Sequence, residues 1–303
     1  MSDIYFGLAV MALLSCGLFS AVVRLSRKFP DRACDVAALL TIVGIVVYIH
    51  YLWDTAALAR LLPFSNLIVI GNWFLPATAI LGGLAWRRIP GHAIRKGFSV
   101  GALLGTGVYA IALPLHGQPP KCEDQWVDGV CLQTSNRTCS AASAASLLRT
   151  YDINATEQEM ADLCLTRQGT TWEGLYRGLK RKTSGTRWDV EVFEGDIQAL
   201  RAKTDRPIIL TVGLPKNAHV SARYTQEYGW REGQMHSVVL FSFRPDGRAV
   251  IGDPSVASGK EYWSVEDQKL LWRGRGLRLV PRQQRSPIAA PVTQVLSRLF
   301  ALD

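Results

Sequence analysis

The sequence predicts an α-helical membrane domain of four transmembrane helices, followed by an α+β domain with an antiparallel sheet. Long apolar stretches dominate residues 1–116, whereas residues 117–303 read as ordinary soluble sequence. In the second part helical patterns come first and strand patterns follow, which is typical of α+β domains. A chain of 303 residues is also long enough for two structural units.

Four apolar stretches are long enough, or nearly so, to cross a bilayer, which takes about 20 predominantly apolar residues. They comprise residues 4–23, 36–53, 64–86 and 98–116. A cleaved signal peptide is an alternative for the first, but its basic residues follow the apolar run instead of preceding it. We therefore expect a polytopic anchor in contact with the lipid bilayer.

Basic residues between these stretches predict the orientation. The first and third loops are basic, and the second has Arg60 as its one cation; the basic residues are Arg24, Arg27, Lys28, Arg32, Arg87, Arg88, Arg95 and Lys96. Basic loops stay in the cytoplasm, so the N-terminus and the second domain are expected outside it. Two glycosylation sequons are interpreted as chance, which favours a bacterial inner membrane with a periplasmic domain.

The net charge of +9 does not indicate a nucleic-acid partner, because no base-reading motif accompanies it. Much of the charge lies in the short loops, and more lies near the C-terminus, at Arg273, Arg275, Arg278, Arg282 and Arg285. Anionic lipid and a solvated face are both open as explanations of the C-terminal arginines.

Cys122 and Cys131 flank a short polar stretch directly after the last apolar run. A disulfide between them would close a small loop and would persist only in an oxidising compartment. Two unrelated thiols or half a metal site are the alternatives. Because no Cys or His pair at metal-ligand spacing completes such a site, we predict the disulfide and expect neither metal nor cofactor.

The soluble part begins with helical patterns. Residues 140–148 are rich in small side chains, and two segments, 156–159 and 170–173, have the form of a capping box that opens a helix. Strand patterns follow at residues 188–192, 207–212, 235–243, 248–251 and 277–280, with a strong turn sequence at 244–247. The tail, residues 287–302, fits either the domain surface or the membrane surface.

Residues suited to cysteine catalysis occur in this part. Cys139 is placed where a polar stretch gives way to the Ala-rich helix, and the positive end of a helix dipole favours a thiolate. A small core cysteine is the plain alternative. Gln133 lies six residues earlier, and its side-chain amide is suited to donate to an oxyanion beside the thiolate.

His236 begins an apolar strand and is a candidate base, and Asp253 ends the next strand and is a candidate for orienting the imidazole. If residues 244–247 form a tight turn, Asp253 pairs nearer Val238 or Val239 than His236. The strands must then bend, bulge or widen for the two side chains to meet. His219 lies in a loop and is the poorer candidate, and His116 is a spare.

Together these residues resemble the papain-like C39 cysteine peptidases, over about residues 131–265. The resemblance rests on the Gln and Cys six residues apart, the Ala-rich helix, the segment 155–170, and the His strand followed by Asp-Pro. It implies a papain-like fold in which Cys139 attacks, His236 is the base, Asp253 orients it and Gln133 completes the oxyanion hole. The substrate class implied is a peptide or protein.

Two departures limit what the resemblance implies. Family members usually read Asp-Cys-Gly at the nucleophile, whereas this chain reads Thr138-Cys139-Ser140. Many members are cytoplasmic parts of peptide-exporting ABC transporters that cut after a double glycine, but this chain has no ATPase phosphate-binding motif. We therefore predict a membrane-anchored peptidase for exported peptides or proteins and do not extend the double-glycine substrate to it.

Three rival interpretations stay open at this point. An acyl or amide transferase would use the same thiol and the same first half-reaction. A peptide-binding module on a membrane anchor would need no catalysis. A channel or transporter would make the helices the functional part, but His50, the ionisable residue well inside a helix, is flanked by Tyr and Trp side chains, which is typical of an interfacial aromatic belt.

Overall fold

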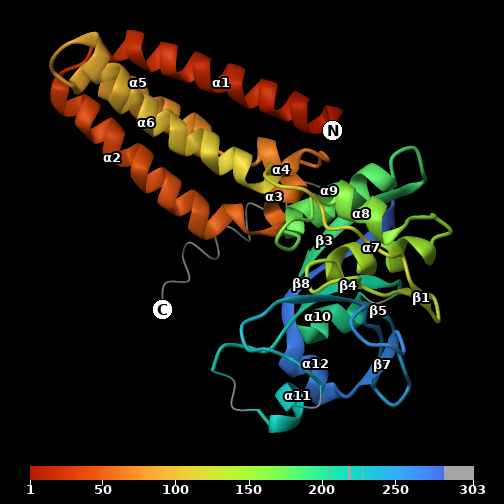
Figure 1. Cartoon of the computed structure of the whole chain (residues 1–303). Coiled ribbons are helices and arrows are strands. Elements are labelled where there is room, and N and C mark those ends of the chain that lie inside the picture. The colour runs from red at the N-terminus through yellow and green to blue at the C-terminus, as the bar shows by residue number, and fades with distance from the viewer. Residues whose placement is uncertain (204, 218–219, 227, 283–303) are drawn as a thin grey trace. The chain divides into compact units, whose positions relative to one another are not determined.

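The computed structural model describes residues 1–303 except 204, 218–219, 227 and 283–303 (Figure 1). The chain divides into a unit of Met1–His116 and a second unit that begins at Gly117. The tail at 287–302, Arg285 and His219, on which the sequence also makes predictions, lie outside the described residues.

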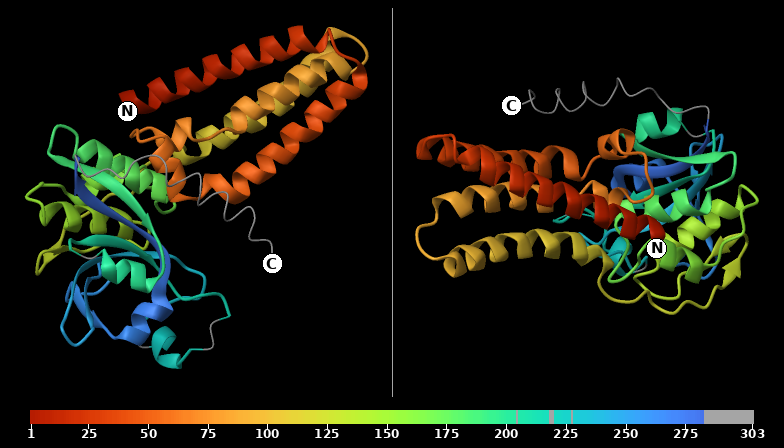
Figure 2. Two further views of the ribbon diagram at one scale, coloured as in Figure 1. Left: turned by 180° about the vertical axis from the view of Figure 1, so that it is seen from behind. Right: turned by 90° about the horizontal axis from the view of Figure 1, so that it is seen from above.

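The first unit is helical and comprises α1 (Ser2–Ser26), α2 (Asp31–Tyr48), a π-helical turn (Ile49–Trp53), α3 (Ala56–Leu61), α4 (Leu67–Ile70), α5 (Phe74–Arg88), α6 (Ala93–Ala112) and a 3-10 turn (Leu113–Leu115). Four segments of it, Ser2–Ser26, Asp31–Trp53, Leu67–Arg88 and Ala93–Leu115, are long and apolar enough to cross a membrane. Figure 2 shows these long helices from two sides, and α5 contacts α1, α2 and α6. Large apolar side chains such as Leu13 and Phe98 are exposed, which suits a lipid environment.

The third of these segments is not one continuous helix. α4 ends at Ile70 and α5 begins at Phe74. Asn72 lies at the break, where its side-chain oxygen accepts a hydrogen bond from the Phe74 backbone N–H at 3.2 Å and its amide donates to the Ala110 carbonyl at 3.0 Å. This side chain therefore satisfies backbone groups that the interruption and the neighbouring helix leave open, which a segment in lipid requires.

The second unit begins with a small two-stranded sheet, β1 (Trp126–Val127) and β2 (Val130–Cys131), and three helices, α7 (Cys139–Arg149), α8 (Glu157–Leu163) and α9 (Trp172–Lys182). The remaining elements are β3 (Trp188–Glu194), α10 (Ile197–Ala202), β4 (Ile208–Val212), α11 (Ala222–Gln226), β5 (His236–Phe243), β6 (Ala249–Gly252), β7 (Lys260–Trp263), α12 (Val265–Leu271) and β8 (Trp272–Pro281). The predicted α+β class with an antiparallel sheet is confirmed.

Six strands form the main sheet in the order β3-β8-β4-β5-β6-β7, with every neighbouring pair antiparallel. The strand predicted at residues 277–280 is the second half of β8. It lies between β3 and β4, so the last described strand is an interior strand of the sheet, next to the edge strand β3. β8 therefore connects β3 to β4, and β4 in turn pairs with β5, the strand that carries His236.

The two faces of the sheet are covered differently. α7 packs on one face, where the hydroxyl of Ser143 donates to the carbonyl of Ser237 on β5 at 2.9 Å. On the other face a core of buried apolar side chains includes Leu200 from α10, Leu271 from α12, and Val238 and Leu240 from β5. The small side chains of α7 are nearly all buried, which lets this helix lie close to the strand that carries His236.

Of the two predicted capping residues, one is confirmed and one is wrong. Thr156 caps α8 and accepts a hydrogen bond from the Glu159 backbone N–H at 3.1 Å. The third helix is capped by Thr171 and not by the predicted Thr170. The reason is that the Thr170 hydroxyl bonds to the Thr166 hydroxyl at 2.7 Å, which leaves the next threonine to cap the helix.

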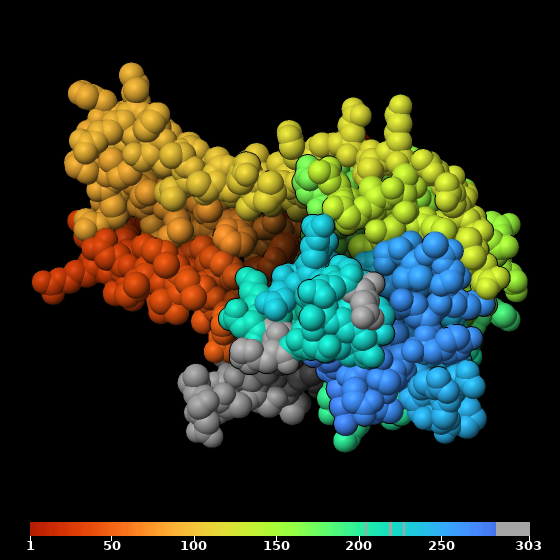
Figure 3. All heavy atoms as spheres, turned by 60° about the horizontal axis from the view of Figure 1, so that its bottom comes forward, coloured from red at the N-terminus to blue at the C-terminus, as the bar shows by residue number. Residues whose placement is uncertain are grey.

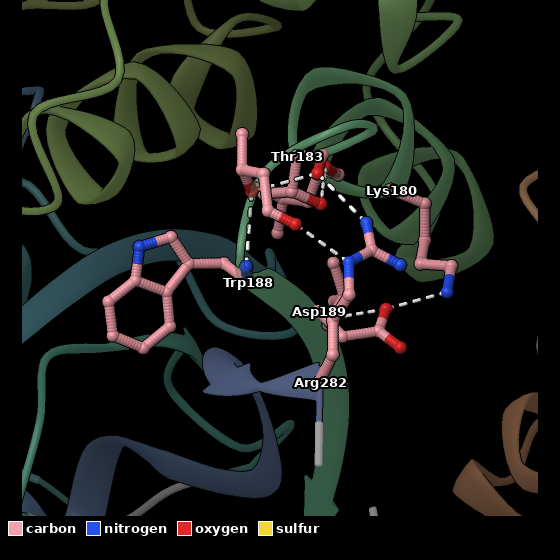
Figure 4. Close-up of polar contacts among 8 residues, drawn as sticks. Lys180, Thr183, Trp188, Asp189 and Arg282 are labelled. Carbon is pink, nitrogen blue, oxygen red and sulfur yellow. Dashed lines mark hydrogen bonds and ion pairs between the residues drawn. The ribbon is translucent and has the colours of Figure 1, made fainter. Parts of the chain in front are cut away.

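A polar network joins the end of α9 to β3 and to the end of β8 (Figure 4). Lys180 pairs with Asp189 at 2.6 Å, and both side chains are largely buried. Arg282 donates to the backbone carbonyls of Thr183 and Thr186 at 3.1 and 2.7 Å. These contacts fix the helical part of the unit to the outer edge of the sheet.

We expect Asp189→Asn to destabilise the second unit by about 1–3 kcal/mol, because it removes the negative charge that pairs with the largely buried Lys180 ammonium. Urea unfolding of the full-length protein in detergent, followed by near-ultraviolet circular dichroism, measures the effect. The control is Asp246→Asn, which removes a more exposed ion pair with Arg248. Equal unfolding midpoints for the two variants would contradict the importance of the buried pair.

Candidate active site

Cys139 is the first residue of α7. Burial raises the pKa of its thiol, but a hydrogen bond and charge attraction from His236, the Ser237 backbone and the Ser140 hydroxyl together lower it below the ordinary value. The end of the helix with free backbone N–H groups adds a positive potential at this position. These interactions therefore stabilise the thiolate of Cys139.

The other described cysteines of the second unit have the opposite environment. Burial raises the pKa of Cys122 and of Cys164 to about 12, and burial with nearby carboxylates also raises that of Cys131. The thiolate is the reactive form of cysteine, so Cys139 is the nucleophile candidate by environment as well as by position.

The predicted disulfide between Cys122 and Cys131 is not present in the structure, where both are free thiols. The two sulfur atoms point to separate partners. That of Cys122 lies 3.6 Å from the carbonyl of Pro120, and that of Cys131 lies 3.9 Å from an Asp124 carboxylate oxygen. The sulfur orientations that these contacts require explain why the prediction from spacing was wrong.

His236 and Asp253 meet directly. The imidazole Nε2 and the carboxylate Oδ1 are 2.8 Å apart, and the Asp253 side chain is almost fully buried. Because Nε2 is occupied by Asp253, Nδ1 is the ring nitrogen that faces the thiol of Cys139. Burial lowers the pKa of His236, but the hydrogen bonds and charges of Asp253 and Cys139 outweigh it and raise the pKa to about 10. The imidazolium is therefore stable beside the thiolate.

The β5–β6 register explains how these two side chains meet. Phe243 pairs with Ala249 and Ser242 with Val250, but Leu240 pairs with Ile251, so Phe241 is an extra residue in β5. Val239 then pairs with Gly252, which brings Asp253 opposite Val238. Without the extra residue Asp253 would lie opposite Val239 and point to the other face, because alternate residues of a strand face opposite sides.

This bulge is the irregularity that the sequence requires for the pair to form. Val238 and His236 are two residues apart, and His236 begins β5, so Asp253 reaches the imidazole diagonally at the end of the strand. Gly252 is matched to the bulge: a Cβ at this position would lie 2.6 Å from the ring of Phe241.

Asp253 is held in its orientation by Ser255. The Ser255 backbone N–H and hydroxyl both donate to Oδ1, at 2.8 and 2.6 Å. Burial raises the pKa of Asp253, but the hydrogen bond to His236, its charge and the two bonds from Ser255 lower it below the ordinary value. The carboxylate is therefore ionised and fixed against the imidazole.

Gln133 lies in the loop before α7, beside this group. Its backbone N–H donates to the carbonyl of Pro254 at 2.8 Å, which joins its loop to the residue after Asp253. In Figure 3 the yellow-green segment near residues 120–150 borders the blue segment of the later strands. The side-chain Oε1 of Gln133 is buried and has no hydrogen-bond partner among the described residues. A half-turn of the amide exchanges this atom with the N–H donors, so the amide is available to a ligand.

A cleft of about 230 Å³ lies at the His236 side of the group. The predicted residues Gln133, His236 and Asp253 line this cleft, together with residues that the sequence did not single out. These further residues are Asn136, Tyr228, Gly229, Trp230, Arg231, Gln234, Met235, Ser255, Val256 and Glu261. Trp230 packs edge-on against the His236 ring, with 5.8 Å between the ring centroids. The cleft is wide enough for a side chain of a bound peptide.

The structure brings the four predicted residues, Cys139, His236, Asp253 and Gln133, together from three separate parts of the unit. Sequence reasoning missed Ser140 and Ser237, whose hydroxyls bond at 2.8 Å and join the nucleophile helix to the His strand. It also missed Ser255. The signal for the first pair was weak: each serine directly follows a candidate catalytic residue.

We expect His236→Ala to raise the pKa of Cys139, because it removes the hydrogen bond and charge that stabilise the thiolate. Asp253→Asn should shift it in the same direction by a smaller amount, because it makes the imidazole less basic. The pH profile of iodoacetamide alkylation, read at each cysteine by mass spectrometry, measures both shifts. Cys122 is the internal control, and an unchanged Cys139 profile in His236→Ala would contradict the ion pair.

Comparisons with known proteins identify a family and several similar structures. Residues 121–276, just over half of the chain, match the Peptidase_C39 like family. No curated protein matches the chain. Among solved structures, the peptidase domain of Streptococcus ComA, a bi-functional ABC transporter involved in quorum sensing, is 21% identical with a TM-score of 0.40 and covers 53% of this chain and 100% of its own.

Two further structures are similar to a comparable extent. A double glycine motif protease from an AMS/PCAT transporter, in complex with the leader peptide, is 19% identical with a TM-score of 0.39 and covers 55% of this chain and 99% of its own. The N-terminal peptidase C39 like domain of the toxin secretion ATP-binding protein from Vibrio parahaemolyticus is 13% identical with a TM-score of 0.35. It covers 49% of this chain and 100% of its own. The family match over residues 121–276 confirms the predicted relationship, and the chain belongs to the Peptidase_C39 like family.

Proposed function

We propose that this protein is a membrane-anchored cysteine peptidase that hydrolyses peptide bonds through a thioester on Cys139. The observation that carries the proposal is the hydrogen-bonded series of Cys139, His236 and Asp253. The thiol has a lowered pKa and the imidazole a raised one, which is the charge arrangement that cysteine catalysis needs.

In the first half-reaction the thiolate of Cys139 attacks the carbonyl carbon of the substrate and forms a C–S bond. The carbonyl oxygen becomes an oxyanion, which accepts hydrogen bonds from the Gln133 amide and the backbone N–H of Cys139. The imidazolium of His236 gives its proton to the amide nitrogen. The C–N bond then breaks, the amine leaves, and a thioester remains on Cys139.

In the second half-reaction the neutral imidazole of His236 accepts a proton from water as the water oxygen attacks the thioester carbon. The C–S bond breaks, the carboxylic acid leaves and the thiolate is restored beside the imidazolium. Asp253 holds the ring by Nε2 throughout, so Nδ1 stays directed at the reacting atoms.

The cleft beside His236 fits the part of the substrate that leaves. The imidazole must reach the departing nitrogen to protonate it, so the leaving segment lies on the His236 side of the scissile bond. The cleft is lined by His236 and Gln133 and adds two large aromatic side chains, Tyr228 and Trp230. Aromatic walls with a few polar groups are typical of sites for extended peptides.

The proposed setting is the outer side of a bacterial inner membrane, with peptides or proteins as substrates. Four apolar helices support the anchor, and the basic loops between them support an outside location for the catalytic unit. One similar structure is a double glycine motif protease from a transporter, and we do not extend that substrate to this chain. Domain boundaries at 1–116 and 117–303 are part of the same proposal.

We expect Cys139→Ala and His236→Ala to abolish peptide cleavage, with losses of about 1,000-fold or more, because each removes a reacting group. The measurement is cleavage of a mixture of synthetic peptides by the full-length protein in detergent, read by mass spectrometry. Cys122→Ser, which removes a thiol with a raised pKa, is the matched control and should keep activity.

Two outcomes of this experiment would contradict the proposal. If every peptide stays intact while Cys139 is alkylated rapidly, the unit is a binding module. If products form only when an amine acceptor is added, the enzyme is an acyl transferase that uses the same thioester.

A further inference from the structure

Glu157 is a buried carboxylate that the mechanism above does not use. It is the first residue of α8, and its exposed fraction is 0%. Its two carboxylate oxygens accept from Thr134, one from the backbone N–H at 2.8 Å and the other from the hydroxyl at 2.5 Å. Hydrogen bonds to a buried charge are among the stronger ones in proteins, so Glu157 holds Thr134 firmly.

Thr134 is the residue next to Gln133, and the two successive backbone N–H groups bond to different elements. That of Gln133 donates to Pro254 after β6, and that of Thr134 donates to Glu157 on α8. The Thr134 hydroxyl also accepts from the Glu123 backbone N–H at 2.8 Å. The peptide that carries the Gln133 side chain is therefore fixed on both sides.

Glu157 itself is fixed to the segment that precedes the site. Its backbone N–H donates to an Asp124 carboxylate oxygen at 2.9 Å, at the start of a helix capped by Thr156. The Glu157 carboxylate is therefore held both by α8 and by the segment that contains Asp124. Its position does not depend on Gln133, which is what a support for that residue requires.

We infer that Glu157 is a positioning residue for the oxyanion hole: by binding Thr134 it sets the direction in which the Gln133 amide points. The inference rests on the proposed function, because it gives Gln133 the role of an oxyanion donor. An oxyanion donor displaced by as little as 1 Å loses much of its effect, so the support has a kinetic consequence.

Two reactions of the same thiol separate this role from a general structural one. Alkylation of Cys139 by iodoacetamide needs the thiolate but forms no oxyanion. Acylation by p-nitrophenyl acetate needs both: the sulfur bonds to the acetyl carbon through a tetrahedral oxyanion, the C–O bond breaks, and p-nitrophenolate leaves with the electron pair. A residue that acts through Gln133 affects the second reaction and spares the first.

We expect Glu157→Ala to slow acylation of the full-length protein by about 10- to 100-fold, measured as the burst of p-nitrophenolate, with an alkylation pH profile like that of the wild type. Glu157→Gln should keep most of the rate, because its amide oxygen still accepts from the Thr134 N–H. The matched control is Glu159→Gln, which changes a carboxylate of the same helix that pairs instead with Lys182.

Thr134→Val keeps the proposal testable if Glu157→Ala does not fold. It removes the hydroxyl that bonds to Glu157 and leaves the backbone bond, so a loss in acylation of about 3- to 10-fold is expected with unchanged alkylation. The double variant Gln133→Ala/Glu157→Ala should be no slower than Gln133→Ala alone, because two residues that act through one donor are not additive.

Three results would overturn the inference. The first is equal slowing of alkylation and acylation in the Glu157 variants, and the second is an acylation rate like that of the wild type in Glu157→Ala (in Thr134→Val, if Glu157→Ala does not fold). The third is a double variant in which the two losses of acylation rate add. Failure of the proposed function has a different signature. In that case wild-type Cys139 is alkylated but releases no burst of p-nitrophenolate.

Discussion

The pairing of β5 with β6 is the constraint on which the site depends, because it decides the face to which Asp253 points. One extra residue at Phe241 changes the register between Leu240 and Ser242. The imidazole of His236 then has a buried carboxylate within hydrogen-bond distance, which raises the pKa of the ring, and His236 in turn lowers the pKa of the Cys139 thiol. Without the bulge the chain would contain the same residues, but the side chains of His236 and Asp253 would not meet.

A charged pair in a largely buried place is favourable only when its geometry is well fixed. Burial opposes the charged form of all three groups, and their mutual hydrogen bonds reverse its effect in each case. Four serine side chains hold much of this geometry in place. Ser140 and Ser143 connect α7 to the strand of His236 through Ser237, and Ser255 holds Asp253. Small hydroxyl side chains suit this task, because they bridge elements that pack closely and lose little side-chain entropy.

Much of this arrangement was predictable from the sequence, since the signals concerned are local. Apolar length predicted the four long helices, and alternating residues predicted β3. An apolar run beside a turn sequence predicted β5, and the sequence before α7 predicted where Cys139 would lie. Long-range features left no such signal. The interior place of β8 depends on its pairing with β3 and β4, and the bulge at Phe241 depends on packing against Gly252. The choice of Thr171 as a cap depends on the hydrogen bond that Thr170 makes. The disulfide was wrong because spacing says nothing of where two sulfur atoms point.

Gly252 and Phe241 illustrate how such a feature limits the variation of the sequence. The ring of Phe241 fills the space that a Cβ at position 252 would need. A larger residue at 252 therefore requires that the Phe241 ring move or be replaced by a smaller side chain, whereas position 241 can become smaller without such a clash. In related chains a residue other than glycine at 252 should therefore occur together with a smaller residue at 241, and this one-way dependence would trace the geometry of the bulge even where the residues of the site stay the same.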